Sequence, residues 1–169
     1  MHIEWPILTP IEQDEVTRLI DGRHHDPHTF LGCHPVYADN ATLVAWVLRV
    51  WLPSAESVKV VFNDPKKSDA SITLFRVMGT DLFTAKISTK QKAILPQHYS
   101  ITWTESDLSE HSVVSCYTFM PQIGELDLHL FAEGKHWHLY NVLGAHSKVV
   151  DGIAGVQFAV WAPAAERIS

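Results

Sequence analysis

Short runs in which apolar and polar residues alternate fill the middle of the chain. In the clearest run, 43–51, Arg49 lies on one face of a strand, so Trp46, Leu48 and Val50 lie on the other. Turn-forming residues separate this run from five further apolar runs, at 58–62, 72–77, 82–87, 99–103 and 113–117. The pattern predicts a mainly β fold, an immunoglobulin-like antiparallel β-sandwich with short flanking helices.

Two other segments have helical spacing. At the first, Thr9 is placed to cap a helix, with Pro10 in its first turn, Glu12 completing a capping box and Gly22 ending it. In the second, Asp127 is placed to cap a turn that runs to Gly134, and apolar residues between 139 and 143 continue on one helical face to Gly144. We expect a helix of about three turns near the N-terminus and a helical bridge over 121–144.

An internal repeat organises the chain. The motif Leu31-Gly-x-His34 returns as Leu143-Gly-x-His146, and each copy is followed by an apolar run that ends in Trp and Pro, at Trp51 and at Trp161. We therefore expect one complete module and the opening strand of a second one. The predicted divisions are a helical lead with a histidine-rich loop (1–34), a β-sandwich (35–120), the helical bridge (121–144) and the truncated start of a second sandwich (145–169).

Composition narrows the class of protein. The net charge is −6 and the only pair of adjacent basic residues of note is Lys66-Lys67, which disfavours a nucleic-acid partner. No apolar run reaches the roughly 18 residues of a membrane span, and the N-terminus lacks the basic and apolar parts of a signal peptide. With two distant cysteines outside any motif, we expect a cytoplasmic, reduced protein that needs no cofactor.

Four histidines lie within eleven residues, at His24, His25, His28 and His34. They could bind a metal, but their spacing is irregular and no cysteine or carboxylate completes a recognisable ligand set. We favour a loop whose polar side chains hydrogen-bond to the backbone and predict no metal site.

Four segments together carry a family resemblance. They are His25-Asp-Pro-His-x-Phe-Leu-Gly-x-His34, Gly124-Glu-Leu-Asp-Leu-His-Leu-Phe-Ala-Glu-Gly-Lys-His136, Leu139-Tyr-Asn-Val-Leu-Gly-Ala-His146 and Phe158-Ala-Val-Trp-Ala-Pro163. The sequence resembles the N-terminal region of bacterial glycogen branching enzymes, the 1,4-α-glucan branching enzymes. The likeness is tight over 124–163 and loose over 63–111.

The resemblance implies a β-sandwich followed by a second one of the starch-binding type, ahead of a barrel that cuts an α-1,4 link and rejoins it as an α-1,6 branch. The catalytic carboxylates of the family lie in that barrel, so no residue here is predicted to be catalytic. The local candidates Glu125, Asp127 and Glu133 adjoin helix ends, where a cap or a solvated charge is the favoured interpretation. The implied partners are α-1,4-glucan, such as glycogen or maltooligosaccharides, and the remaining modules of the same protein.

Sugar-binding sandwiches present aromatic rings, on which the apolar faces of pyranose rings stack. Trp103, at the end of its predicted strand between Thr and Glu, is the first candidate, and Trp46 and Tyr99 follow. For each ring the alternative is core packing, because large aromatic side chains dominate protein cores. For Trp51 and Trp161, which share one position in the repeat, we expect a shared packing role.

Two hypotheses about function remain open at this stage. The chain is either a non-catalytic region that contacts glucan and positions it for the enzyme, in glycogen biosynthesis, or a structural sandwich that serves assembly and has no ligand of its own.

Overall fold

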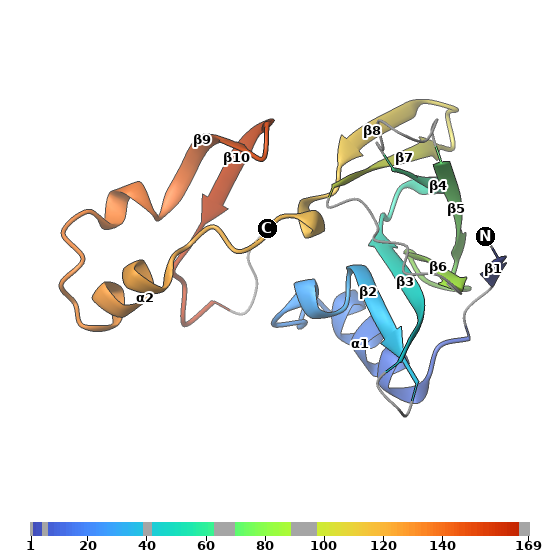
Figure 1. Ribbon diagram of the computed structural model, residues 1–169, viewed down its shortest axis with the longest axis horizontal. Helices are drawn as coiled ribbons and strands as arrows, with labels where there is room; N and C mark the ends of the chain where they lie inside the picture. Colours follow the sequence, from blue (N-terminus) through green and yellow to red (C-terminus); the bar gives the residue numbers. More distant parts are fainter. Residues whose placement is uncertain (1, 5–6, 39–41, 63–69, 89–97, 166–169) are drawn as a thin grey trace. The chain divides into compact units, whose positions relative to one another are not determined.

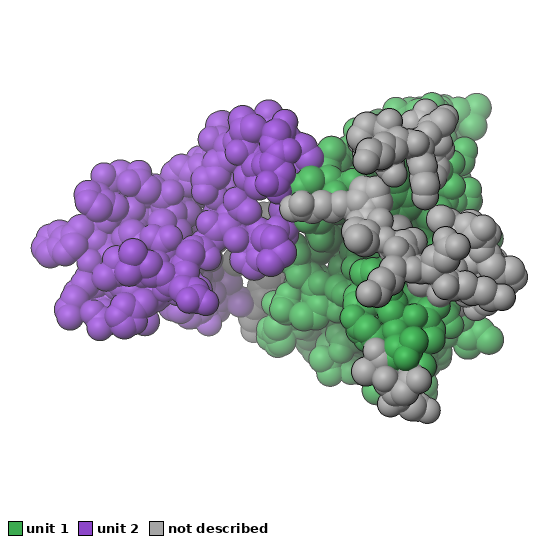
Figure 2. All heavy atoms as spheres, viewed as in Figure 1, with its two compact units in different colours: residues 1–118 green, residues 119–169 purple. Residues whose placement is uncertain are grey.

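The computed structural model describes residues 2–4, 7–38, 42–62, 70–88 and 98–165 (Figure 1). The chain divides into two compact units, residues 1–118 and residues 119–169, which are coloured separately in Figure 2. No helix in the described ranges is long and apolar enough to cross a membrane.

The first unit begins with helix α1 (Pro10–Ile20), whose ends are those that the sequence predicts. The Thr9 hydroxyl accepts a hydrogen bond from the Glu12 backbone N–H at 3.3 Å, and the Glu12 carboxylate accepts one from the Thr9 backbone N–H at 2.8 Å. This capping box satisfies two helix-terminal donors. Gly22, with a φ of 66°, lets the chain turn away after the helix.

Antiparallel strands form the rest of the first unit, as predicted, with two 3₁₀ turns between them (Figure 1). The strands pair in the order β2-β3-β6-β5-β4-β7-β8, and β1 adds to β6. Strand β5 pairs with β4 through residues 70–74 and with β6 through Phe75 and Arg76, so the sheet folds into two layers at this strand. The first layer contains β1, β2, β3 and β6, and the second layer contains β4, β7 and β8. The elements are β1 (His2–Glu4), η1 (Pro27–Thr29), β2 (Gly32–Tyr37), β3 (Leu43–Trp51), β4 (Ala55–Phe62), β5 (Ala70–Arg76), β6 (Leu82–Ser88), β7 (Tyr99–Glu105), β8 (Glu110–Val114) and η2 (Cys116–Thr118).

The main core lies between the two layers and contains Leu48 and Val50 of β3, as the alternation of that strand predicts. A second cluster covers the other face of the first layer, where Val16 of α1 packs with Phe30, Leu31 and Leu82. Strand β3 is therefore buried on both faces. The buried core residues of the main cluster are Leu48, Val50, Ala55, Val58, Val60, Phe62, Ile72, Leu74, Phe83, Ala85, Ile87, Tyr99 and Ile101.

Arg49 is the charged residue on the second face of β3. Its guanidinium bonds to the carboxylate of Glu12 in α1, donates to the Phe30 carbonyl at 3.4 Å and lies 4.5 Å from the centre of the Phe30 ring. The hydrogen bonds and the carboxylate compensate the cost of burying the charge. This residue ties helix α1 to the sheet.

The second unit contains α2 (Glu125–Ala132), η3 (Leu139–Asn141) and a hairpin of β9 (Gly144–Val150) and β10 (Ile153–Ala159). Asp151 and Gly152 form its two-residue turn with φ values of 52° and 81°. Two consecutive positive φ values are typical of the type I′ turn, whose twist matches that of a hairpin.

The structure corrects several local predictions. Residue Gly124, not Asp127, is the N-cap of α2, and the Asp127 carboxylate accepts a weak hydrogen bond of 3.4 Å from the Gly124 N–H. Residues 139–143 make one 3₁₀ turn instead of a longer helix, because Gly144 already pairs with Ala159 in the hairpin. Strand β8 lies three residues earlier than predicted, β2 lies partly in the predicted loop, and the second unit has two paired strands where one was expected.

Candidate functional site

Trp103, the first candidate for sugar stacking, lies near the end of β7 directly opposite His111 of β8. The two rings stack with their centres 5.1 Å apart and their planes 24° from parallel. Trp103 also packs against the main core and is half-buried. The exposed part of this pair is therefore a composite surface, in which His111 covers part of the indole.

Polar groups converge beside these rings on the carboxylate of Glu105. Its Oε1 accepts hydrogen bonds from Trp103 Nε1 at 3.4 Å and from Ser54 Oγ at 3.2 Å, and it lies 3.6 Å from His111 Nε2. Ser109 Oγ lies 3.1 Å from the same imidazole nitrogen. A ring surface bordered by a carboxylate, an imidazole and hydroxyls offers both stacking and hydrogen bonds to a polyhydroxyl ligand.

The other two candidates do not join this surface. Tyr99 is 3% exposed, makes an edge contact of 5.8 Å with Phe62, and burial raises its pKa to about 12. Tyr99 does not reach the surface, because alternation along β7 directs residues 99, 101 and 103 into the core and solvent reaches only the last. Trp46 is half-buried against the main core, with its indole nitrogen buried.

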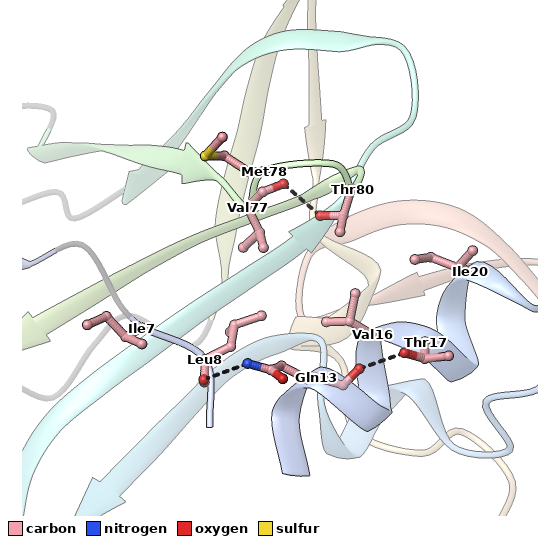
Figure 3. Close-up of a pocket in the computed structure, with 9 residues that line it drawn as sticks. All are labelled: Ile7, Leu8, Gln13, Val16, Thr17, Ile20, Val77, Met78 and Thr80. Atoms are coloured by element: carbon pink, nitrogen blue, oxygen red, sulfur yellow. Dashed lines mark hydrogen bonds between the residues drawn. The ribbon is translucent and has the colours of Figure 1, made fainter. Parts of the chain in front are cut away.

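A shallow groove lies elsewhere on the first unit, between α1, the segment 7–8 and the turn from β5 to β6 (Figure 3). Its volume is about 470 Å³, and three local hydrogen bonds fix its walls, from Gln13 Nε2 to the Leu8 carbonyl, from Thr17 Oγ1 to the Gln13 carbonyl and from Thr80 Oγ1 to the Val77 carbonyl. The residues that line it include no aromatic ring, so it offers no stacking platform for a sugar. They are Ile7, Leu8, Gln13, Val16, Thr17, Ile20, Val77, Met78 and Thr80.

Histidines hold corresponding places in the two copies of the repeat. Adding 112 to a residue number in the first copy gives its counterpart in the second, as for Gly32 and Gly144. His34 Nε2 lies 2.9 Å from the Leu31 carbonyl, and His146 Nε2 lies 2.9 Å from the Leu143 carbonyl. The two glycines have φ values of 103° and 107°. The repeat predicted from sequence thus has one local geometry in both copies.

The structure extends the repeat further upstream than the sequence motif indicates. In the first copy His24 Nε2 lies 2.6 Å from Glu15 Oε2 of α1, and in the second His136 Nε2 lies 2.8 Å from Asp127 Oδ1 of α2. Both imidazole side chains are 7% exposed. We name these contacts the helix–histidine pairs. Sequence reasoning missed them, although testing the 112-residue offset beyond the Leu-Gly-x-His motif would have aligned all four residues.

The hairpins of the two copies also share one register. Gly32 of β2 is opposite Arg49 of β3, and Gly144 of β9 is opposite Ala159 of β10. Trp51 packs with the cluster beneath α1, and Trp161 makes an edge contact of 4.9 Å with Phe131 of α2. Each Trp thus packs near the helix of its own copy, although Trp161 remains 62% exposed.

The carboxylates singled out from the sequence make local contacts with basic side chains. Asp127 contacts His136, and Glu133 lies 3.0 Å from Lys135 Nζ and 3.4 Å from His129 Nε2. Burial raises the pKa of the Cys33 thiol to about 12, which opposes its use as a nucleophile. Within the described ranges, no three His, Cys, Asp or Glu side chains are grouped so that they could hold a metal ion.

Comparison with known proteins decides the family. Residues 12–117, more than half of the chain, match the model of the N-terminal domain of the alpha-1,4-glucan branching enzyme GlgB. The chain belongs to the GlgB branching-enzyme family. This match covers most of α1 and the strands from β2 to β8.

Individual GlgB relatives extend the match into the second unit. The chain is similar to the 1,4-alpha-glucan branching enzymes GlgB of Hydrogenovibrio crunogenus (53% identity over 94% of this chain), Cellvibrio japonicus (46% over 92%) and Synechocystis sp. (36% over 94%). It spans 20% of the length of each of these relatives. Among solved structures, the catalytic module of the glycogen-degrading pneumococcal virulence factor SpuA covers 50% of this chain and matches with a TM-score of 0.35 and 21% identity, a likeness that carries no argument here.

Proposed function

We propose that this chain is the non-catalytic, glucan-contacting and chain-positioning N-terminal region of a 1,4-α-glucan branching enzyme, acting in glycogen biosynthesis. Membership of the GlgB family is the observation that carries the proposal. The longer protein would cut an α-1,4 link and rejoin it as an α-1,6 branch in a catalytic barrel. The present region would hold part of a glucan chain relative to that barrel.

The pairing of local carboxylates supports a non-catalytic role. A retaining glycosyl transfer needs a carboxylate nucleophile and a carboxylic acid about 5 Å apart across the scissile bond. Asp127 instead contacts the buried imidazole of His136, and Glu133 contacts the exposed Lys135. On this proposal the purified chain produces no new branches in amylose.

The Trp103–His111 surface of the first unit is the proposed place of glucan contact. Its stacked rings and the polar groups around Glu105 suit a pyranose ring with its hydroxyls. Since this surface is open, most of a bound oligosaccharide stays solvated, and we expect a millimolar dissociation constant, equivalent to about 4 kcal/mol.

Titration of the chain with maltoheptaose tests the proposal. Saturable shifts of indole N–H signals in NMR spectra would support glucan binding, and Trp103→Ala should weaken it while the circular dichroism spectrum is unchanged. A chain that shows no saturable shift would overturn the glucan-contacting role. The alternative is then a structural role in assembly, which the aliphatic groove of Figure 3 favours because its lining suits an apolar protein surface.

We also propose that the second unit opens a second sandwich of the starch-binding type, which the longer protein completes. The shared hairpin register supports this proposal. In the first unit the corresponding face of β3 is covered by the second layer of strands.

A further inference from the structure

The loop that follows α2 and includes η3 in the second unit carries two strongly exposed aromatic side chains. Trp137 is 88% exposed and Tyr140 is 67% exposed. The imidazole of His138 lies between them in sequence, and its Nδ1 is 3.2 Å from the Tyr140 hydroxyl, with ring centres 5.9 Å apart. Large aromatic rings are rarely this exposed unless they contact a ligand or another protein, so these two rings indicate a candidate binding surface.

The internal repeat distinguishes two reasons for exposure in the second unit. Phe158 and Val160 of the second copy correspond to Leu48 and Val50 of the first, at an offset of 110 residues, because the second hairpin has a shorter connection. Leu48 and Val50 are buried by the second layer of strands. The exposure of Phe158 and Val160 is therefore what this hairpin shows without a second layer.

Trp137 and Tyr140 behave differently in the same comparison. Their counterparts, at the offset of 112 residues, are His25 and His28. Both histidines are exposed in the first unit, although its second layer of strands is present and Tyr117 makes an edge contact of 4.8 Å with His28. Completing the second sandwich in the same way would therefore leave Trp137 and Tyr140 exposed.

The loop is held in place by short-range contacts. The His136 imidazole, next to Trp137, is anchored to Asp127 of α2 at 2.8 Å. Backbone hydrogen bonds run from Trp137 N to the Lys135 carbonyl at 3.1 Å and from Asn141 N to the His138 carbonyl at 2.9 Å. A ligand that stacks on these rings therefore has little backbone to order, which lowers the entropic cost of binding.

We propose that Trp137 and Tyr140, with His138 between them, form a second binding platform for linear α-1,4-glucan. The proposal rests on the proposed function and adds to it a site on the second unit. The ring faces supply stacking surface for glucose units, and the His138 imidazole and Tyr140 hydroxyl supply hydrogen bonds to sugar hydroxyls. Aromatic rings interleaved with such polar groups suit a sugar better than the aliphatic lining of the groove in Figure 3.

The first copy of the repeat supplies a test variant that the fold accepts. Because histidine occupies both corresponding positions on the same local backbone, the double variant Trp137→His, Tyr140→His removes the large rings and keeps residues that this loop geometry tolerates. Trp103→Ala removes the proposed platform of the first unit and serves as the matched variant. Both variants are made in the full 169-residue chain, and unchanged circular dichroism verifies folding.

The experiment titrates maltoheptaose into the three proteins up to about 20 mM, above the millimolar dissociation constant expected for an open site. Indole N–H signals in NMR spectra report the binding, and cellohexaose, a β-1,4-glucan, controls for linkage. We expect the Trp137 signal to shift saturably with maltoheptaose, and we expect the double variant to bind about fivefold more weakly or to lose binding at this surface.

The outcomes separate this inference from the proposed function. If Trp103→Ala abolishes binding and the double variant binds like the wild type, the second platform is refuted and the proposed function stands. If the wild-type chain does not bind maltoheptaose, both fail. Equal shifts with cellohexaose would refute the assignment to α-1,4-glucan in particular.

Discussion

His136 of the loop after α2 lies 2.8 Å from Asp127 of the helix itself, nine residues earlier in the chain. The first copy has the same arrangement in His24 and Glu15. In both copies a glycine with a φ near 66°, Gly22 or Gly134, turns the chain between the helix and its histidine. The helix–histidine pairs therefore fix how each helix connects to the first strand of its hairpin.

Removing one such pair should loosen one unit only. We expect His136→Ala to destabilise the second unit by about 1–3 kcal/mol, because it removes a hydrogen bond to a carboxylate and the packing of a buried imidazole. Hydrogen exchange of the β9 amides should accelerate, while that of the β2 amides should not change. His24→Ala is the matched variant and should show the opposite pattern. Acceleration in both units by either substitution would contradict the local role.

The contact between Glu12 and Arg49 should be strongly coupled. Glu12→Gln should destabilise the first unit by about 2–4 kcal/mol, because it leaves the buried Arg49 charge without its counterpart, and Arg49→Met should destabilise it by less, because Glu12 is only half-buried. The double variant should lose less than the sum of the single losses by at least about 1 kcal/mol. Urea unfolding of the four proteins measures this coupling. Additive losses would mean that Arg49 acts mainly through its contacts with Phe30.

Acid should weaken the same contact. Burial alone would raise the pKa of Glu12, but the hydrogen bonds from Thr9 and the charge and hydrogen bond of Arg49 outweigh burial and lower it below 4.5. A carboxyl group whose folded pKa is lowered contributes stability above its unfolded pKa and loses it as the pH falls through the folded value. The unfolding free energy of the wild type should thus fall toward that of Glu12→Gln below about pH 4.5. A difference between the two proteins that stays constant down to pH 2.5 would contradict this assignment.

Glycine is required at position 32 for two separable reasons. Its φ is 103°, and an added Cβ would lie 3.0 Å from the Tyr117 Cβ. Gly79 also has a positive φ, 75°, but its added Cβ would meet nothing within 4 Å. Gly79→Ala should cost about 1 kcal/mol from backbone strain, and Gly32→Ala should cost about 2–4 kcal/mol from strain and overpacking. Equal shifts of the urea unfolding midpoint in Gly32→Ala and Gly79→Ala would show that Tyr117 moves aside without a loss of stability.

The features predicted correctly from the sequence depend on neighbouring residues. The capping box at Thr9 and the alternation in β3 are local patterns, and both are confirmed. Strand β2 was partly missed because Pro35 and the surrounding polar residues look like a loop, although proline is acceptable in this edge strand.

The candidate site depended more on tertiary structure. Tyr99 and Trp103 lie four residues apart on β7, so alternation places both side chains on the same face of the strand. Trp103 is within reach of solvent only because it lies near the end of the strand. Trp137 and Tyr140 carry no local signal that distinguishes a surface ring from a core ring. Their exposure became informative only when the structure showed that His25 and His28 are exposed at the corresponding positions of the first copy.

The apolar face of the β9–β10 hairpin should make this chain self-associate. Val149, Val156 and Phe158 lie on one face, because Val149 is opposite Ala154 and alternation places residues 154, 156 and 158 on the same side. All three are more than half exposed. Burying such side chains between two copies is worth on the order of 5 kcal/mol, enough to favour a dimer at high protein concentration.

Sedimentation velocity over a range of protein concentrations should therefore show a reversible dimer. The double variant Val156→Thr, Phe158→Ser should shift it to monomer without unfolding the first unit, because that unit has its own complete core. Met78→Ser is the control, since Met78 is as exposed as any of these residues but lines the groove of the first unit. If Met78→Ser dissociates the dimer and the hairpin variant does not, the groove is the self-association surface and the hairpin face tolerates exposure.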